Sequence, residues 1–197
     1  MKKKEQVEQN KWKNIQNDLA DKSGTAIVVV DKNSAALYEA NNNSICKTLY
    51  SSDEFSSECD KFCGKAFEMA NQTGIIVEYE CYAGLDCRAV PIKKDGETEF
   101  AAIVGKAFRK TSNYRAAAER AISGDWSQFP PSEFFENVLL KGAVNDLEVA
   151  AKIIENLDDE KKDALIKFAE NENIEVTEKS DQPQVADEKA VKQSGKL

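Results

Sequence analysis

The sequence contains no histidine among its 197 residues. Histidine is the usual base that activates a cysteine nucleophile, so thiol catalysis lacks its commonest partner here. The nine glycines are scattered and never take the spacing of a phosphate-binding loop. The carboxylates fall on expected solvent faces, where a catalytic pair cannot be told from surface charge. These absences argue against an enzyme. A small hydrolase or transferase would be supported only if catalytic turnover were found to depend on one cysteine.

Basic charge and long apolar runs are also scarce. Lys and Arg number 27 against 35 Asp and Glu, which gives a net charge of −8 and a pI near 4.8. Nucleic-acid binding needs clustered cations, and crossing a bilayer needs about 20 consecutive apolar residues. The opening segment lacks the apolar core of a secretion signal. We therefore expect a cytoplasmic protein that binds neither nucleic acid nor membrane.

Five cysteines are present, an odd number in a chain of ordinary length. A disulfide scaffold is therefore not expected, and free thiols in a reducing compartment fit better. Cys59 and Cys63 are four residues apart, so on a helix their sulfurs would lie one turn apart and could hold one ion or small group. Free cysteine is more often a buried packing residue, however, and no CxxC pair is present.

Hydrophobic patterning predicts an α+β fold. Residues 7–21 form a helix with a narrow apolar stripe, and the β-branched run at 25–31 forms a hairpin with 35–40. The turn-rich segment 41–58 is expected to be a loop that carries Cys46 inward. A helix should follow from Ser57, which with Asp60 forms a plausible N-terminal cap, and should end at Gly74.

Three more strands are predicted at 75–81, 85–92 and 98–108, the last two joined through Asp95 and Gly96, a strong hairpin signal. About five strands in this order fit a small antiparallel sheet with helices packed on one face.

The C-terminal part is predicted to be helical and then disordered. A short helix should end at Gly124, and a helical hairpin should follow around 147–154 and 164–169. Residues 173–197 contain no aromatic residue and too little apolar surface to offset the entropy of ordering. We therefore expect one domain over residues 1–172 and a disordered tail over 173–197.

Six short segments also resemble a known family in their order and spacing. They are "NNNSIC" at 41–46, "CDKFC" at 59–63, "CYAGL" at 81–85, "AVPI" at 89–92, "DG" at 95–96 and "IVGKAF" at 103–108. Together they resemble the PocR-type sensory domain, a bacterial and archaeal ligand-binding family related to the PAS fold. The resemblance extends from the helix around Trp12 to the helical hairpin near Ala169.

This resemblance implies a sensor that holds a small molecule against the sheet, proposed for the family to be a small hydrocarbon derivative such as a diol. Family members usually carry an output part, such as a DNA-binding segment, a histidine kinase or a cyclase. We expect none in this chain, so the signal would pass to a separate signalling protein.

The resemblance further implies a cysteine-lined site. Cys46, Cys59, Cys63 and Cys81 match the family's cysteine positions, whereas Cys87 does not and is assigned to strand packing. The family commonly has histidine after the cysteine of the "AGL" motif, and Tyr82 stands there instead.

Cys46, Cys59, Cys63, Cys81 and Tyr82 are therefore the expected ligand-binding residues. Tyr82 would offer a hydroxyl to the ligand or would simply cover the core. The alternative is a metal or redox-sensing interaction module. The four matching thiolates, Cys46, Cys59, Cys63 and Cys81, would then bind Zn²⁺ in a closed structural site or form a reversible disulfide.

Overall fold

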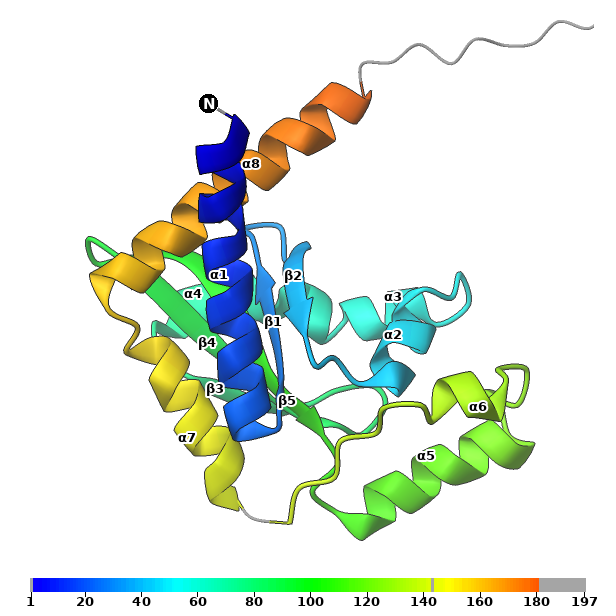
Figure 1. Ribbon diagram of the computed structural model, residues 1–197. Coiled ribbons are helices and arrows are strands. Elements are labelled where there is room, and N and C mark those ends of the chain that lie inside the picture. The colour runs from blue at the N-terminus through cyan, green and yellow to red at the C-terminus, as the bar shows by residue number, and fades with distance from the viewer. Residues whose placement is uncertain (1, 143, 181–197) are drawn as a thin grey trace, which may run out of the picture.

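The computed structural model describes residues 2–142 and 144–180, and the side chains of residues 11–142 and 146–172. A five-stranded sheet lies at the centre, with helices around it (Figure 1). The strands are β1 (Ala26–Val30), β2 (Ala36–Ala40), β3 (Val77–Glu80), β4 (Asp86–Lys94) and β5 (Glu97–Ala107). The helices are α1 (Lys2–Ser23), α2 (Ser44–Tyr50), α3 (Ser56–Asp60), the 3₁₀ turn η1 (Cys63–Lys65), α4 (Ala66–Thr73), α5 (Thr111–Ser123), α6 (Pro131–Phe134), α7 (Val144–Glu155) and α8 (Asp159–Ser180).

The strands lie in the order β2-β1-β5-β4-β3, and every neighbouring pair is antiparallel. β2 and β3 form opposite edges, so the chain between them must cross the sheet. That crossing contains α2, α3, η1 and α4. The predicted α+β fold with five antiparallel strands is confirmed, and it is consistent with a PAS-like domain.

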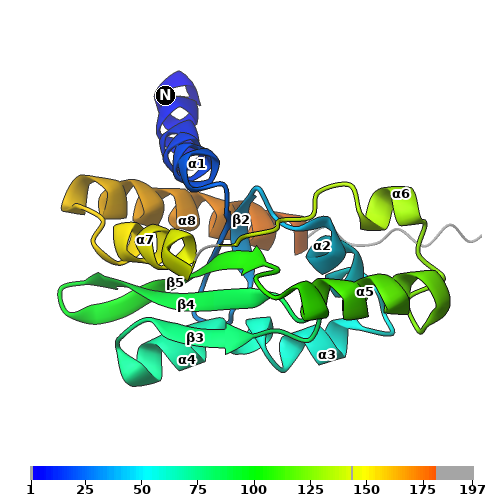
Figure 2. The same cartoon turned by 90° about the horizontal axis from the view of Figure 1, so that it is seen from below.

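Helices cover both faces of the sheet, so the prediction of helices on one face is wrong. Figure 2 shows α1, α7 and α8 on one side of the sheet and α3 and α4 on the other. The physical reason is visible in β1, whose five residues are all buried. Such a continuous apolar run is typical of a strand that is covered on both faces, whereas a half-exposed strand alternates.

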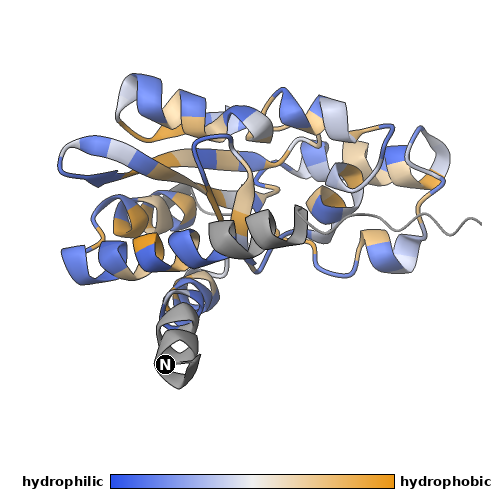
Figure 3. Cartoon of the chain, turned by 90° about the horizontal axis from the view of Figure 1, so that it is seen from above, coloured by the Kyte–Doolittle hydropathy of each residue, from blue (hydrophilic) through white to orange (hydrophobic). Residues whose placement is uncertain are grey.

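Alternate residues of β1 therefore belong to two cores. Val28 and Val30 pack with α2 to α6 in a layer that we call the thiol-side core, because all the cysteines lie in or against it. Ile27 and Val29 pack with α1, α7 and α8 in a layer that we call the α1-side core, which includes the buried Trp12. Figure 3 shows the hydrophobic residues concentrated on the strands between these helical layers.

Local structure departs from the prediction in the crossing. The segment 41–58, predicted as a loop, contains α2 and α3. The side chain of Asn43 accepts a hydrogen bond from the backbone N–H of Ile45 and so caps α2. The asparagine run therefore forms the start of a helix and not a loop. Further on, α3 has no side-chain cap, so the expected cap at Ser57 does not form. The predicted continuous helix to residue 74 is divided into α3, η1 and α4, and only its end at Gly74 is confirmed.

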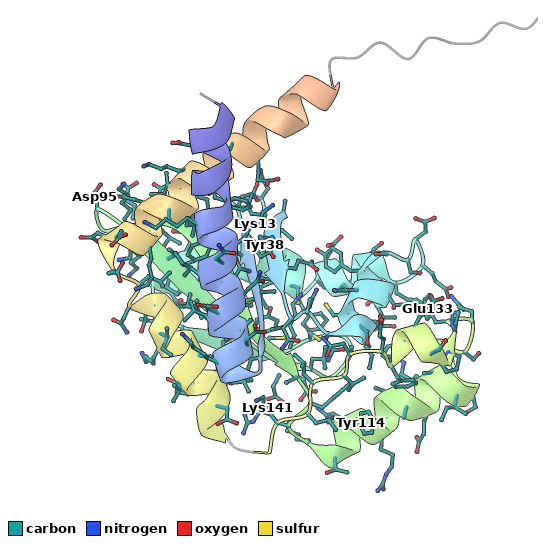
Figure 4. The ribbon with its side chains drawn as sticks, in the orientation of Figure 1. Lys13, Tyr38, Asp95, Tyr114, Glu133 and Lys141 are labelled. Carbon is teal, nitrogen blue, oxygen red and sulfur yellow. The ribbon has the colours of Figure 1, made fainter. Side chains whose placement is uncertain are left out.

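The turn between β4 and β5 is confirmed. Asp95 and Gly96 both have positive φ angles, 51° and 89°, as a two-residue hairpin turn of this kind requires. Asp95 lies at the tip of this hairpin, at the end of the molecule where α8 begins (Figure 4).

The C-terminal helices α7 and α8 pack beside α1. Lys11 pairs with Glu160 at 2.7 Å, and the ammonium of Lys13 lies 5.4 Å from the ring centre of Tyr38 (Figure 4). The predicted tail begins at residue 173, whereas α8 continues to Ser180; the rest of that tail, residues 181–197, lies outside the described residues. Among the described helices, none combines the length and the apolar character that crossing a membrane requires.

Candidate functional site

A bulge near the end of β5 brings a lysine into the thiol-side core. Asp86 pairs with Ala107 and Cys87 pairs with Gly105, which leaves Lys106 without a partner on β4. Gly105 and Lys106 have φ angles of 106° and 47°, and the second is uncommon for a residue with a side chain. Such bulges redirect a side chain and are frequent next to functional sites.

The bulge is held from both ends. The side-chain amide of Asn43 donates a hydrogen bond of 3.1 Å to the carbonyl oxygen of Lys106. At the other end of the residue, the ammonium Nζ of Lys106 donates to Cys46 Sγ at 3.2 Å. Both partners come from the start of α2, so α2 and the bulge of β5 position each other.

Lys106 is an ammonium with almost no contact with water, since only 3% of the residue is exposed. Burial disfavours its charge, but the attraction of Cys46, Cys63 and Cys87 outweighs burial and raises the pKa of Lys106 above its ordinary value. None of the carboxylates in the described part of the chain forms an ion pair with it. In their thiolate forms, these cysteines supply its electrostatic support.

All five cysteines are free and lie in or against the thiol-side core. The crossing between β2 and β3 brings Cys46, Cys59 and Cys63 over this face of the sheet, while β4 and the bend before it bring Cys87 and Cys81. Cysteines that are distant in the sequence thus pack in or against one core layer. Cys87, which is assigned to strand packing, is fully buried and joins them: its Sγ lies 3.5 Å from the carbonyl oxygen of Leu85.

The thiols differ in acidity. A hydrogen bond from Cys87, the nearby Lys106 and a hydrogen bond of 3.4 Å from the Tyr79 hydroxyl lower the pKa of Cys63 to about 6, against the opposing effect of burial. Burial raises the pKa of Cys46 to about 11 and that of Cys59 to about 12. This lowered pKa favours the thiolate form of Cys63, which is the feature here that favours the redox-sensing alternative.

A metal site is not formed by these residues. In the described chain, no three Cys, Asp or Glu side chains are grouped so that they could hold a metal ion. The predicted zinc ligands Cys46, Cys59, Cys63 and Cys81 share one core, but they do not fit a closed tetrahedral site in this arrangement.

A cavity of about 660 Å³ opens between β1, β2, the bulge of β5 and α2. Exposed residues line its opening, including Glu39, Lys47, Tyr50 and Ser51. Buried residues line its inner part, including Val28, Val30, Cys46, Cys63, Ile103 and Lys106. Of the five predicted ligand-binding residues, Cys46 and Cys63 line this cavity, whereas Cys59, Cys81 and Tyr82 do not.

Tyr82 lies in an aromatic group that covers the thiol-side core. Its ring stacks on Phe55 with centres 6.4 Å apart and meets the edge of Trp126 at 5.9 Å. Its hydroxyl accepts a hydrogen bond from Arg120 of α5. The bend before β4 is confirmed, with Gly84 at a φ of 78°, but it directs Tyr82 toward α5 and away from the cavity. Of the two predicted roles, these contacts match that of a cover.

Sequence reasoning missed Lys106 and Asn42, which also lines the cavity. A signal for Lys106 was present: it follows a glycine inside the apolar strand "FAAIVGKAF". An isolated glycine in a strand indicates a bulge, and a lysine within a buried strand is almost never without a partner. Asn42 gave no such signal, because a run of three asparagines is typical of a turn.

The acidity of Cys63 predicts how stability depends on pH. The ordinary thiol pKa is 9.0, so between about pH 6 and 9 the unfolded chain holds a proton that folded Cys63 has lost. Stability should therefore rise with pH in this window, with a slope approaching about 1.4 kcal/mol per pH unit. Above pH 9 it should fall, because folded Cys46 and Cys59 keep protons that the unfolded chain loses. Urea unfolding at a series of pH values measures this curve.

The absence of histidine leaves this pH window almost free of other titrating side chains. In Cys63→Ala the rise between pH 6 and 9 should flatten. In Cys59→Ala, the matched control, the rise should persist, because the folded pKa of Cys59 lies above the window. An unchanged rise in Cys63→Ala would contradict the assignment.

Comparison with known proteins identifies the family. The family model described as the sensory domain found in PocR matches residues 5–169, most of the chain. No curated protein and no solved structure gave a match. The match confirms the resemblance that the six short segments predicted, and a sensory family points to signalling and not to catalysis. The chain belongs to the family of PocR sensory domains.

Proposed function

We propose that the protein senses a small molecule that binds in the cavity beside α2. The observation that carries this proposal is the position of a buried lysine and two cysteines at the inner part of a cavity of about 660 Å³. Small-molecule sites commonly have volumes of about 300–1,000 Å³, with apolar walls and a few placed polar groups. The walls given by Val28, Val30 and Ile103 meet this description.

The cavity wall is connected to the helices that cover the sheet. The Ser44 hydroxyl at the start of α2 donates to the carbonyl oxygen of Phe134 in α6 at 2.9 Å and accepts from the backbone N–H of Asn137 at 3.0 Å. A ligand that moves α2 would therefore move the α6 segment. The change can be no larger than the ligand's preference for one conformation. We propose that a signalling protein reads this change.

Blocking the cavity tests the proposal. Ala36 is exposed and lines the cavity, so Ala36→Trp should obstruct it at little cost in stability. We expect at least one class among small alcohols, diols and carboxylic acids to raise the melting temperature of the unsubstituted protein by a few degrees, the shift that about 1 kcal/mol of binding energy produces. The rise should disappear in Ala36→Trp.

Val149→Trp is the matched control. Val149 is exposed on α7 and lines a separate hollow between α1 and α7. The ligand response should persist in this variant. No response to any compound, or a response lost in Val149→Trp and kept in Ala36→Trp, would contradict a binding site beside α2.

A further inference from the structure

The ammonium of Lys106 has hydrogen-bonding capacity that the protein leaves unused. An ammonium has three N–H donors, and the hydrogen bond found for Lys106 within the described residues goes to one sulfur, Cys46 Sγ. Cys63 attracts Lys106 through space, but no hydrogen bond joins the two among the described contacts. A buried cation is costly unless an anion pairs with it closely. The side chain lines the cavity, so an anionic ligand group can reach it.

Asn42, which lines the same cavity, has a second unused polar atom. Its Nδ2 donates to the carboxylate of Glu39 at 2.9 Å, and a carboxylate only accepts, so the orientation of the amide is fixed. Its Oδ1 is buried and has no hydrogen-bond partner, and the residue as a whole is 3% exposed. The backbone is also held, because Asn137 Nδ2 donates to the carbonyl oxygen of Asn42 at 3.1 Å. A buried acceptor of this kind costs about 1–3 kcal/mol while it stays unpaired.

We infer that the ligand is a small hydroxycarboxylate, whose carboxylate pairs with Lys106, whose hydroxyl donates to Asn42 Oδ1, and whose carbon chain packs on Val28 and Ile103. This inference rests on the proposed function and names the ligand class of the same site. A neutral diol would leave the unused N–H donors of Lys106 without an anionic acceptor. An amine would be repelled by it. A carboxylic acid without a hydroxyl would leave Asn42 Oδ1 unpaired.

Three probes of equal chain length separate these contributions: 2-hydroxyhexanoate, hexanoate and 1,2-hexanediol. Isothermal titration calorimetry on the full chain should give the tightest binding for 2-hydroxyhexanoate. Each of the other two lacks one interaction with a buried group, so we expect each to bind on the order of tenfold more weakly or worse.

Lys106→Met should remove the preference for the two acids over the diol. Lys47→Met is its matched control, because Lys47 lies at the same cavity but is exposed at the opening. It should keep the preference, since an exposed charge contributes little. Asn42→Ala gives an independent measurement if Lys106→Met does not fold: it should bring 2-hydroxyhexanoate and hexanoate to similar affinities and leave hexanoate binding nearly unchanged.

The outcomes distinguish the two proposals. If 1,2-hexanediol or another neutral compound binds as tightly as the hydroxy acid, and Lys106→Met has no effect, the ligand class is wrong while the binding site stands. The same holds if hexanoate equals 2-hydroxyhexanoate in the unsubstituted protein. If no compound of any class binds and Ala36→Trp changes nothing, the proposed function itself fails.

Discussion

Gly105→Ala should destabilise the protein by about 3–5 kcal/mol, the sum of a strained backbone and an overpacked core. Gly105 has a φ of 106°, which residues with side chains rarely adopt. A Cβ at this position would lie 2.7 Å from Leu147 Cδ2 and 2.9 Å from the carbonyl oxygen of Asp86. Leu147 is fully buried and the carbonyl belongs to β4, so neither can move without disturbing packing or pairing. Urea unfolding followed by tryptophan fluorescence measures the loss.

Gly142→Ala is the control for the loss of a glycine as such. Among the described residues, a Cβ at Gly142 would meet no atom within 4 Å, and its φ is not in the strained range, so the change should stay within about 0.5 kcal/mol. A loss below about 1 kcal/mol for Gly105→Ala would show that the bulge is not rigid. Lys106 would then not be held in a fixed position for a ligand.

The strands could be predicted from the sequence because their signals are local. The β-branched run of β1 and the Asp95–Gly96 turn each fix a strand or a hairpin through neighbouring residues alone. The end of α4 at Gly74 is equally local, since its φ of 65° is the left-handed conformation that suits glycine at a helix end. Five strands in this order then leave few possible sheets.

The division of the core between two faces is less local. Val28 and Ile27 are equally apolar in the sequence, and only the positions of the crossing helices and of α1 decide which core each joins. The same residue types would serve a strand covered on one face by helices and on the other by a second sheet. The apolar run of β1 is typical of a strand with two covered faces, which the prediction of helices on one face did not use, and it does not indicate what covers them.

The candidate site could be predicted only in part. Cys46 and Cys63 were identified because the family motifs contain them, but Lys106 reaches the cavity through a register shift between β4 and β5. The shift depends on pairing between residues 18 positions apart, Cys87 and Gly105, and no periodicity within one strand reports it. Asn42 becomes notable only once its Oδ1 is known to lack a partner.

Gln16→Leu should destabilise the protein by about 3–5 kcal/mol, although leucine suits a buried helix position. Gln16 is fully buried on α1, where its Oε1 accepts from Trp12 Nε1 at 2.8 Å. Its Nε2 donates to the carbonyl oxygens of Ile27 at 2.7 Å and Tyr38 at 3.0 Å, one on β1 and one on β2. Leucine would leave a buried indole N–H unpaired and remove a donor from each carbonyl, at about 1–3 kcal/mol for each unsatisfied group.

Gln72→Leu makes the same substitution where the amide is exposed. Gln72 Nε2 donates to Glu68 Oε1 on the surface of α4, and water can replace that partner, so the loss should stay within about 0.5 kcal/mol.

Trp12→Phe separates the contributions at the buried site, because it removes the indole N–H but keeps an aromatic ring. If the amide connects α1 to β1 and β2, Gln16→Leu should cost less in the Trp12→Phe background, since no N–H is then left unpaired. Equal losses of unfolding free energy in the two backgrounds would show that Trp12 and Gln16 act independently. A small loss for Gln16→Leu in the unsubstituted protein would show that apolar packing holds α1 to the sheet.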